Sequence, residues 1–142
     1  MDDERDPARD RLPRPWIALV GDVAVLVVFV LVGRRSHHED AGLAGFLRVW
    51  WPFAVALGVA WLVAGLWRLP LAWSRAIAAW LITVALGMAL RIAVQGRDFK
   101  VAFTIVTLLF VGAGMLGWRA VVRGRRARAH SPASGESPKR RD

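Results

Sequence analysis

The sequence predicts an all-α fold: a polytopic membrane protein with a bundle of four transmembrane helices and disordered, charged termini. Hydrophobic residues make up 56% of the 142 residues and gather in four separate blocks, and most charged residues lie between the blocks. Each block is continuously apolar and does not alternate, which favours helices over the strands of a membrane barrel.

The four blocks are long enough to cross a bilayer, since a helix needs about 20 mostly apolar residues to do so. The expected spans are residues 16–33, 49–67, 76–94 and 101–118. They form one transmembrane domain, 16–118, between a charged N-terminal tail, 1–15, and a basic disordered tail, 119–142. The first span is expected to be retained, because its leader mixes acidic and basic residues and no small-residue cleavage site follows it.

The distribution of basic residues predicts that both termini are cytoplasmic. With four spans, the N-terminal tail, the 68–75 loop and the C-terminal tail share one side, and they carry 14 of the 20 Lys and Arg residues. Lys and Arg are retained on the cytoplasmic side of a membrane, so the expected location is the cell (inner) membrane. Indole rings prefer the membrane interface, and six tryptophans fall at the expected boundaries. They are Trp16, Trp67, Trp73 and Trp118 on the inner side and Trp50 and Trp51 on the outer side.

Composition and motifs argue against several kinds of function. The chain has no Cys, which excludes disulfides, thiol catalysis and Cys-ligated zinc. We find no phosphate-binding loop, no serine nucleophile elbow and no paired carboxylates within a span, so no enzymatic activity and no cofactor are expected. The pI of about 11.7 is not taken to indicate nucleic-acid binding, because the basic residues flank membrane spans and form no recognisable binding module.

The loop after the first span carries two weak site hypotheses. His37, His38 and Glu39 suggest a metal site, but adjacent histidines rarely point to one ion and the chain offers no second ligand cluster, so no metal is expected. An anion site formed by Arg34, Arg35 and His37 is more plausible, although a solvated loop is the simpler interpretation.

The ionisable residues inside the spans are the strongest candidates for a site. A charged residue within a span costs about 2.5–3.5 kcal/mol on insertion scales and is a functional hypothesis by default. A helix rises about 1.5 Å per residue, which places Asp22 at the same depth as Trp61, Trp80 and Thr83. We therefore predict a substrate- or ion-binding site made by these four residues. The alternative is that a protonated Asp22 donates to a backbone carbonyl or to Thr83 and only fixes helix packing.

Arg91 is included in the predicted site but lies near the outer end of the third span. About 12 Å in depth separates it from Asp22, which argues against an ion pair between them. Glu39, Asp40 and Asp98 are better-placed partners for Arg91. An interfacial anchor is therefore favoured over a ligand site for this arginine.

Small, polar and aromatic residues recur on one stripe of each expected helix, as they do at contacts between membrane helices. The stripes are Asp22, Leu26, Phe29 and Gly33; Ala54, Gly58, Trp61 and Gly65; Trp80, Thr83, Gly87 and Arg91; and Thr104, Thr107, Val111, Gly114 and Trp118. Small residues also recur every fourth position at Ala56, Ala60 and Ala64 and at Ala113 and Gly117.

The sequence resembles the domain of unknown function 3054 family, small membrane proteins of bacteria and archaea. The matching pieces are GDVAVLVVFVLVGRRSHH (21–38), WPF (51–53), Pro70, WLITVALGMALR (80–91), AF (102–103) and LGWR (116–119). The resemblance implies a four-helix membrane protein without an assigned activity. It gives weight to residues inside the matching pieces, namely Asp22, Arg34, Arg35, His37, Pro52, Thr83, Gly87 and Arg91.

Of the functions weighed, the sequence favours the first of two slightly over the second, and a membrane enzyme built on the GRRSHHED loop (33–40) with Arg91 ranks last. The first is a small transporter-like protein, active as a homo-oligomer, in which Asp22 exchanges a proton for a cation beside indole rings. The second is a non-catalytic membrane scaffold or accessory subunit in which Asp22 and Arg91 set the helix register. The expected partners are the lipid bilayer and anionic lipids, the latter bound through the basic C-terminal tail.

Overall fold

The computed structural model describes residues 14–35, 42–96 and 98–129, and each regular element in these ranges is an α-helix. The helices are α1 (Pro15–Arg35), α2 (Leu43–Ala64), α3 (Trp73–Gln95) and α4 (Val101–Ala129). Each is long and apolar enough to cross a membrane. The predicted all-α class and the four membrane-spanning helices are therefore confirmed.

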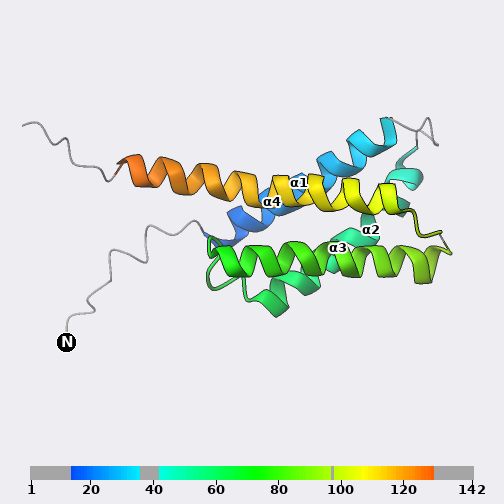
Figure 1. The fold of residues 1–142 in the computed structure, drawn as a ribbon, viewed down its shortest axis with the longest axis horizontal. Coiled ribbons are helices and arrows are strands. Elements are labelled where there is room, and N and C mark those ends of the chain that lie inside the picture. The colour runs from blue at the N-terminus through cyan, green and yellow to red at the C-terminus, as the bar shows by residue number, and fades with distance from the viewer. Residues whose placement is uncertain (1–13, 36–41, 97, 130–142) are drawn as a thin grey trace, which may run out of the picture.

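The helices run up and down in the order of the chain (Figure 1). α1 packs on α2, α2 on α3, α3 on α4, and α4 returns to α1, so the four helices close a ring. The contact between α2 and α3 is the most extensive. The start of α1, the α2–α3 connection and the end of α4 consequently lie at one end of the bundle, which we call the arginine end because it holds Arg14, Arg68, Arg75 and the arginines of α4 after residue 118.

α4 is the longest helix and continues past the other three at the arginine end (Figure 1). Its 29 residues give it a length of about 43 Å, more than the roughly 30 Å of a hydrocarbon core. The sequence placed the end of the fourth span at Trp118 and a disordered tail after it. Residues 119–129 instead continue the helix, because all of them except Gly124 are Ala, Val or Arg, which are compatible with helix, and no proline interrupts them.

α2 contains Pro52, whose missing N–H leaves the carbonyl of Arg48 without its usual partner in the helix. The side-chain amide of Gln95, the last residue of α3, donates a hydrogen bond to this carbonyl. An unpaired backbone group is costly at a membrane protein's apolar surface, and a neighbouring helix supplies the partner here. Pro52 and Gln95 thus help to join α2 to α3 at the end opposite the arginine end.

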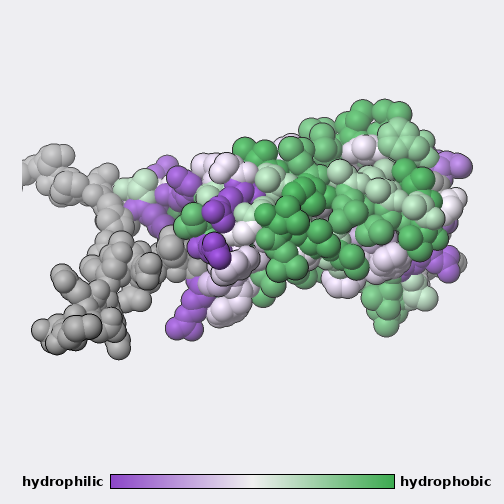
Figure 2. Space-filling view, turned by 90° about the horizontal axis from the view of Figure 1, so that it is seen from below, coloured by the Kyte–Doolittle hydropathy of each residue, from purple (hydrophilic) through white to green (hydrophobic). Residues whose placement is uncertain are grey.

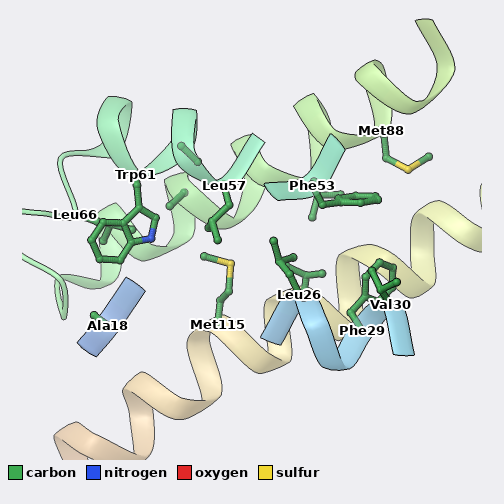
Figure 3. Packing of buried hydrophobic residues seen from close by; sticks show 14 residues of the cluster. Ala18, Leu26, Phe29, Val30, Phe53, Leu57, Trp61, Leu66, Met88 and Met115 are labelled. Atoms are coloured by element: carbon green, nitrogen blue, oxygen red, sulfur yellow. The ribbon is translucent and has the colours of Figure 1, made fainter. Parts of the chain in front are cut away.

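Buried side chains from all four helices form one continuous core (Figure 3). Phe29, Phe53 and Met88 lie toward one end, and Trp61 and Leu66 lie toward the other. Phe29 makes the central ring contacts, with centroids 5.7 Å from those of Phe53 and of Phe110. Aromatic pairs at this separation contribute about 0.5–1.5 kcal/mol beyond their buried area.

The predicted stripes of α1, α3 and α4 largely coincide with their buried faces, and the stripe of α2 does not. Gly58 is exposed, and the buried face of α2 is formed by Pro52, Phe53, Ala56, Leu57, Ala60 and Trp61. The apolar residues of α2 surround the helix almost evenly. The stripe predicted from its small and polar residues therefore lies on a different side of the helix from the face that is buried. In α4 the buried small residue is Gly112, whereas Ala113 is exposed.

Three glycines allow helices to approach closely. A Cβ at Gly87 would lie 2.4 Å from the ring of Phe53, one at Gly112 would lie 2.6 Å from the ring of Trp80, and one at Gly114 would lie 2.4 Å from Val25. Such small residues at membrane helix contacts let large side chains of the neighbouring helix fill the space above the backbone. They fix the packing of α2 on α3, of α3 on α4 and of α4 on α1.

The surface of the bundle is divided into an apolar belt and polar ends (Figure 2). The belt consists of exposed Val, Leu and Ile side chains on all four helices, among them Leu62 at 74% and Leu109 at 65% exposure. Hydrophilic residues gather at the arginine end and, in smaller number, at the opposite end. A belt of this kind is expected where lipid chains, not water, surround the protein.

Candidate functional site

Asp22 lies inside α1, seven residues after its start, and its side chain is completely buried. At about 1.5 Å per residue it sits roughly 10 Å from the beginning of the helix. Residues 15–33, which include all of α1 except its last two residues, contain no lysine, arginine or histidine. Its partners must therefore come from other elements of the bundle.

Arg119 of α4 forms a bidentate ion pair with Asp22. Its Nη1 lies 2.6 Å from Oδ1 of the carboxylate and its Nη2 lies 2.7 Å from Oδ2, and both side chains are 0% exposed. Two parallel N–H···O bonds between a planar guanidinium and a carboxylate are short, strong and geometrically specific. The pair links the first helix to the last, across 97 positions of sequence.

Two indole rings complete the surroundings of the carboxylate. Nε1 of Trp118 donates to Oδ1 and Nε1 of Trp61 donates to Oδ2, each at 2.9 Å. Each oxygen therefore accepts two hydrogen bonds, which is the full capacity of a carboxylate. All four hydrogen bonds come from N–H groups of three residues, so the side chain of Asp22 acts only as an acceptor here. The hydrogen bond between Asp22 and Thr83 that the sequence offered as an alternative is not formed, since the hydroxyl of Thr83 has no partner in the described part of the chain.

Arg119 is itself held by backbone carbonyls. Its Nε donates to the carbonyl of Pro70 at 2.9 Å, and its Nη1 also donates to the carbonyl of Met115 at 2.7 Å. Pro70 belongs to the 65–72 connection between α2 and α3, so the ion pair also anchors this connection. A buried charge is tolerated only when its remaining donors are satisfied in this way.

Two more arginines bind the same connection. Nη1 of Arg75 donates to the carbonyl of Gly65 at 2.8 Å, and Nη1 of Arg123 donates to the carbonyl of Leu71 at 2.8 Å. Carbonyls at the end of a helix and in a connection lack helical partners, and guanidinium groups satisfy them and complement the helix dipole. The connection between α2 and α3 is thus packed onto the bundle, with Leu66 completely buried.

The network can fix the arrangement of helices, and it offers little to a reactant. Every acceptor position of Asp22 is occupied by a protein donor. Neither of two shallow surface depressions at the arginine end, one beside Arg123 and one beside Arg75, is lined by Asp22 or its three partners. Among the residues that the structure describes, no group of three His, Cys, Asp or Glu side chains is placed to hold a metal ion.

The predicted meeting of four residues at one depth is realised for Asp22 and Trp61 only. Nε1 of Trp80 instead donates to the carbonyl of Leu108 on α4, 3.0 Å away and ten residues before the Trp118 that binds Asp22. Thr83 is completely buried, and its hydroxyl makes no hydrogen bond within the described part of the chain. Trp80 and Thr83 therefore do not join Asp22 in the predicted site.

Arg91 forms no ion pair with Asp22, in agreement with the difference in depth between the two residues that the sequence predicts. Its guanidinium carbon is 4.4 Å from the ring centroid of Phe103, and the same ring neighbours Phe29 at 6.1 Å. A cation over an aromatic face is attracted by the ring quadrupole. Arg91 therefore packs against the aromatic cluster near the end opposite the arginine end.

The weakly predicted anion site is described only in part. Nη2 of Arg34 donates to the carbonyl of Gly42 at 3.1 Å, which closes the α1–α2 connection. Arg35 is the last residue of α1. The side chain of Arg35 and the whole of His37, His38, Glu39 and Asp40 lie outside the described residues.

Arg119 and the hydrogen-bonding role of Trp118 were missed in the sequence. Both lie in LGWR (116–119), a piece that carries the family resemblance, so the signal was present. The span was ended before Arg119 because an arginine after an apolar run usually marks the interface. Hydropathy alone does not distinguish an arginine that faces water from one that turns back to a buried carboxylate.

The fold and the site together define a class: a four-helix membrane protein whose first and last helices are joined by a buried arginine–aspartate pair. Residues 19–122 match the model of the family described as Protein of unknown function (DUF3054), and the chain belongs to this family. The matched range includes Asp22, Trp61, Trp118 and Arg119. No curated protein and no solved structure matches the chain.

Proposed function

We propose that this protein is a non-catalytic membrane scaffold or accessory subunit. The observation that carries the proposal is the saturated network around Asp22. A carboxylate that transports protons or cations must become free to bind them, whereas this carboxylate accepts four hydrogen bonds from protein donors. Its geometry is what a fixed connection between helices requires.

The transporter-like function favoured by the sequence is the competing proposal. An ionisable pair within membrane helices is a functional hypothesis by default, and indole rings next to a carboxylate suit a cation. This function requires Asp22 to leave Arg119 and to meet solvent during a transport cycle. A transport assay therefore separates the two proposals.

Proteoliposomes that contain the wild-type protein, Asp22→Asn or Asp98→Asn test this difference. Asp98 is the matched control, because it is the other acidic residue within the described ranges and is exposed. The scaffold proposal predicts no cation-dependent proton flux above that of empty vesicles for any of the three proteins. It also predicts that Asp22→Asn lowers stability, because the substitution removes the charge that pairs with Arg119.

A flux that is present in the wild type and in Asp98→Asn but absent in Asp22→Asn would overturn the scaffold proposal and establish the transporter. Infrared spectroscopy gives an independent measurement. At neutral pH, the difference between wild type and Asp22→Asn should contain a carboxylate band and no protonated-carboxyl band.

We also propose that the arginine end faces the cytoplasm and that the protein lies in the cell (inner) membrane. The support is the concentration of described arginines at this end, where α4 alone contributes Arg119, Arg123, Arg125, Arg126 and Arg128. Lys and Arg near span ends are retained on the cytoplasmic side.

Labelling of single cysteines tests the orientation without background, since the chain has no Cys of its own. Ser74 begins α3 at the arginine end and Lys100 precedes α4 at the opposite end, and both are exposed. A membrane-impermeant maleimide should label Lys100→Cys in intact cells or spheroplasts. It should label Ser74→Cys only after the membrane is opened, and the reverse pattern would refute the orientation.

A further inference from the structure

A shallow depression beside the end of α2 is a second feature of the arginine end, separate from the buried ion pair. It has a volume of about 480 Å³ and is lined by Leu62, Val63, Ala64, Gly65, Trp67, Arg68 and Arg75. Its lining thus combines two guanidinium groups with apolar side chains. No residue of α4 lines it.

Within the described residues, no acidic side chain pairs with the two arginines of the depression. The described part of the chain contains two acidic residues, Asp22 and Asp98, of which the first is paired with Arg119 and the second lies at the opposite end of the bundle. Arg68 is exposed, with its guanidinium carbon 4.4 Å from the ring centroid of Trp67. The depression therefore presents positive charge that no described carboxylate neutralises.

Arg75 is held in a fixed position by the backbone. Its Nη1 donates to the carbonyl of Gly65 at 2.8 Å, and this bond leaves Nη2 and Nε without an acceptor in the described ranges. Gly65 has φ of +64°, and a Cβ there would lie 2.6 Å from Nη1 of Arg75. The glycine thus permits both the left-handed end of α2 and the close approach of the guanidinium. The result is a half-buried cation with donors still available for an anion.

The apolar part of the lining continues the belt of the bundle. Leu62 and Val63 are 74% and 70% exposed, and Trp67 is 51% exposed. In a membrane these side chains meet lipid chains, and the indole of Trp67 lies at the level of the headgroups. A ligand that fills the depression must therefore present an anionic group next to an apolar chain.

We propose that this depression binds the phosphate headgroup of an anionic glycerophospholipid. The phosphate lies between the guanidinium groups of Arg68 and Arg75, and the acyl chains lie along Leu62 and Val63. Arginine is suited to phosphate because its planar donors bind two oxygens at once. Basic pockets beside membrane helices commonly recognise anionic headgroups.

Native mass spectrometry of the full chain in detergent tests the proposal, with phosphatidylglycerol as the probe lipid. Three proteins are compared: the wild type, Arg68→Gln/Arg75→Gln, and Arg125→Gln/Arg128→Gln. The last is the matched control, because it removes two charges from exposed arginines of the same end that do not line the depression. Each basic residue near anionic lipid contributes about fivefold in affinity, so the first double variant should bind at least about tenfold more weakly. The control should bind as the wild type does.

Equal losses in the two double variants would overturn the proposal in favour of a diffuse basic surface. Equal binding of phosphatidylcholine would overturn it as well, since that lipid carries no net charge. If millimolar inorganic phosphate displaced phosphatidylglycerol, the proposal of a lipid site would be overturned, and the ligand of the depression would be a soluble anion. Arg68→Gln alone keeps the hydrogen bonds of Arg75 and the end of α2, and it should weaken lipid binding severalfold in a protein of unchanged stability. No weakening in this variant would also refute the site.

Discussion

Replacement of Arg119 by leucine should lower the free energy of unfolding by about 3–5 kcal/mol, the range observed when one partner of a buried ion pair is removed. The substitution leaves the carboxylate of Asp22 with two indole donors in a completely buried position. It also deprives the carbonyl of Pro70 of its donor. Unfolding in mixed micelles of increasing sodium dodecyl sulfate, followed by tryptophan fluorescence, measures the change.

Arg125→Leu is the control for this substitution. Arg125 lies on the same helix, is exposed, and should change stability by no more than about 0.5 kcal/mol when replaced. The double variant Asp22→Leu/Arg119→Leu removes both charges, and it should be considerably more stable than the sum of the two single losses predicts. Strict additivity of the two losses would show that the pair does not couple α1 to α4.

Gly87→Ala should destabilise the bundle by about 1–3 kcal/mol, the usual cost of inserting a methyl group into a packed core. The added Cβ would lie 2.4 Å from Cδ1 of Phe53, whose side chain is 0% exposed. The ring has little freedom to move away, because it packs edge-on against Phe29 with centroids 5.7 Å apart. The same unfolding measurement applies.

Gly58→Ala is the matched control for Gly87→Ala, since it adds the same methyl group to a helical glycine that has nothing within 4 Å of the new atom. It should be neutral or slightly stabilising, because alanine favours helix over glycine. Shortening the opposing side chain provides a second check. In the Gly87→Ala background, Phe53→Leu should recover part of the lost stability, and a further additive loss would contradict the close contact.

The general architecture was predictable because it depends on properties that sequence displays directly. Long apolar blocks separated by charges determine the number of helices, and an even number of helices joined by short connections places both ends of the bundle domain on one side. The rotation of each helix was predictable where polar or small residues are confined to one face, as with Asp22 on α1 and Gly87 on α3. It was not predictable for α2, whose apolar residues surround the helix and whose buried face is chosen by its neighbours.

Two residues of the candidate site, Asp22 and Trp61, could be predicted from the sequence, whereas Arg119 could not. The depth of Asp22 and Trp61 follows from counting residues along straight helices, and their hydrogen bond of 2.9 Å is consistent with that estimate. The partner Arg119 depends on how far α4 continues as a helix and which way a long side chain turns. The direction of the side chain is fixed by its bonds to Asp22 and to the carbonyl of Pro70, both of which lie far from Arg119 in the sequence.

The closure of the helix ring by Asp22 and Arg119 has a consequence for how the protein is made. Membrane helices are inserted in the order of the chain, and 96 residues separate the aspartate from its arginine. Until α4 has been synthesised, Asp22 is a carboxyl group in an apolar segment without its counterion, at an insertion cost of about 2.5–3.5 kcal/mol. Only a chain that includes α4 relieves this cost. A product truncated before residue 119 therefore keeps an unpaired carboxyl group within its first membrane span, which the full chain pairs with Arg119.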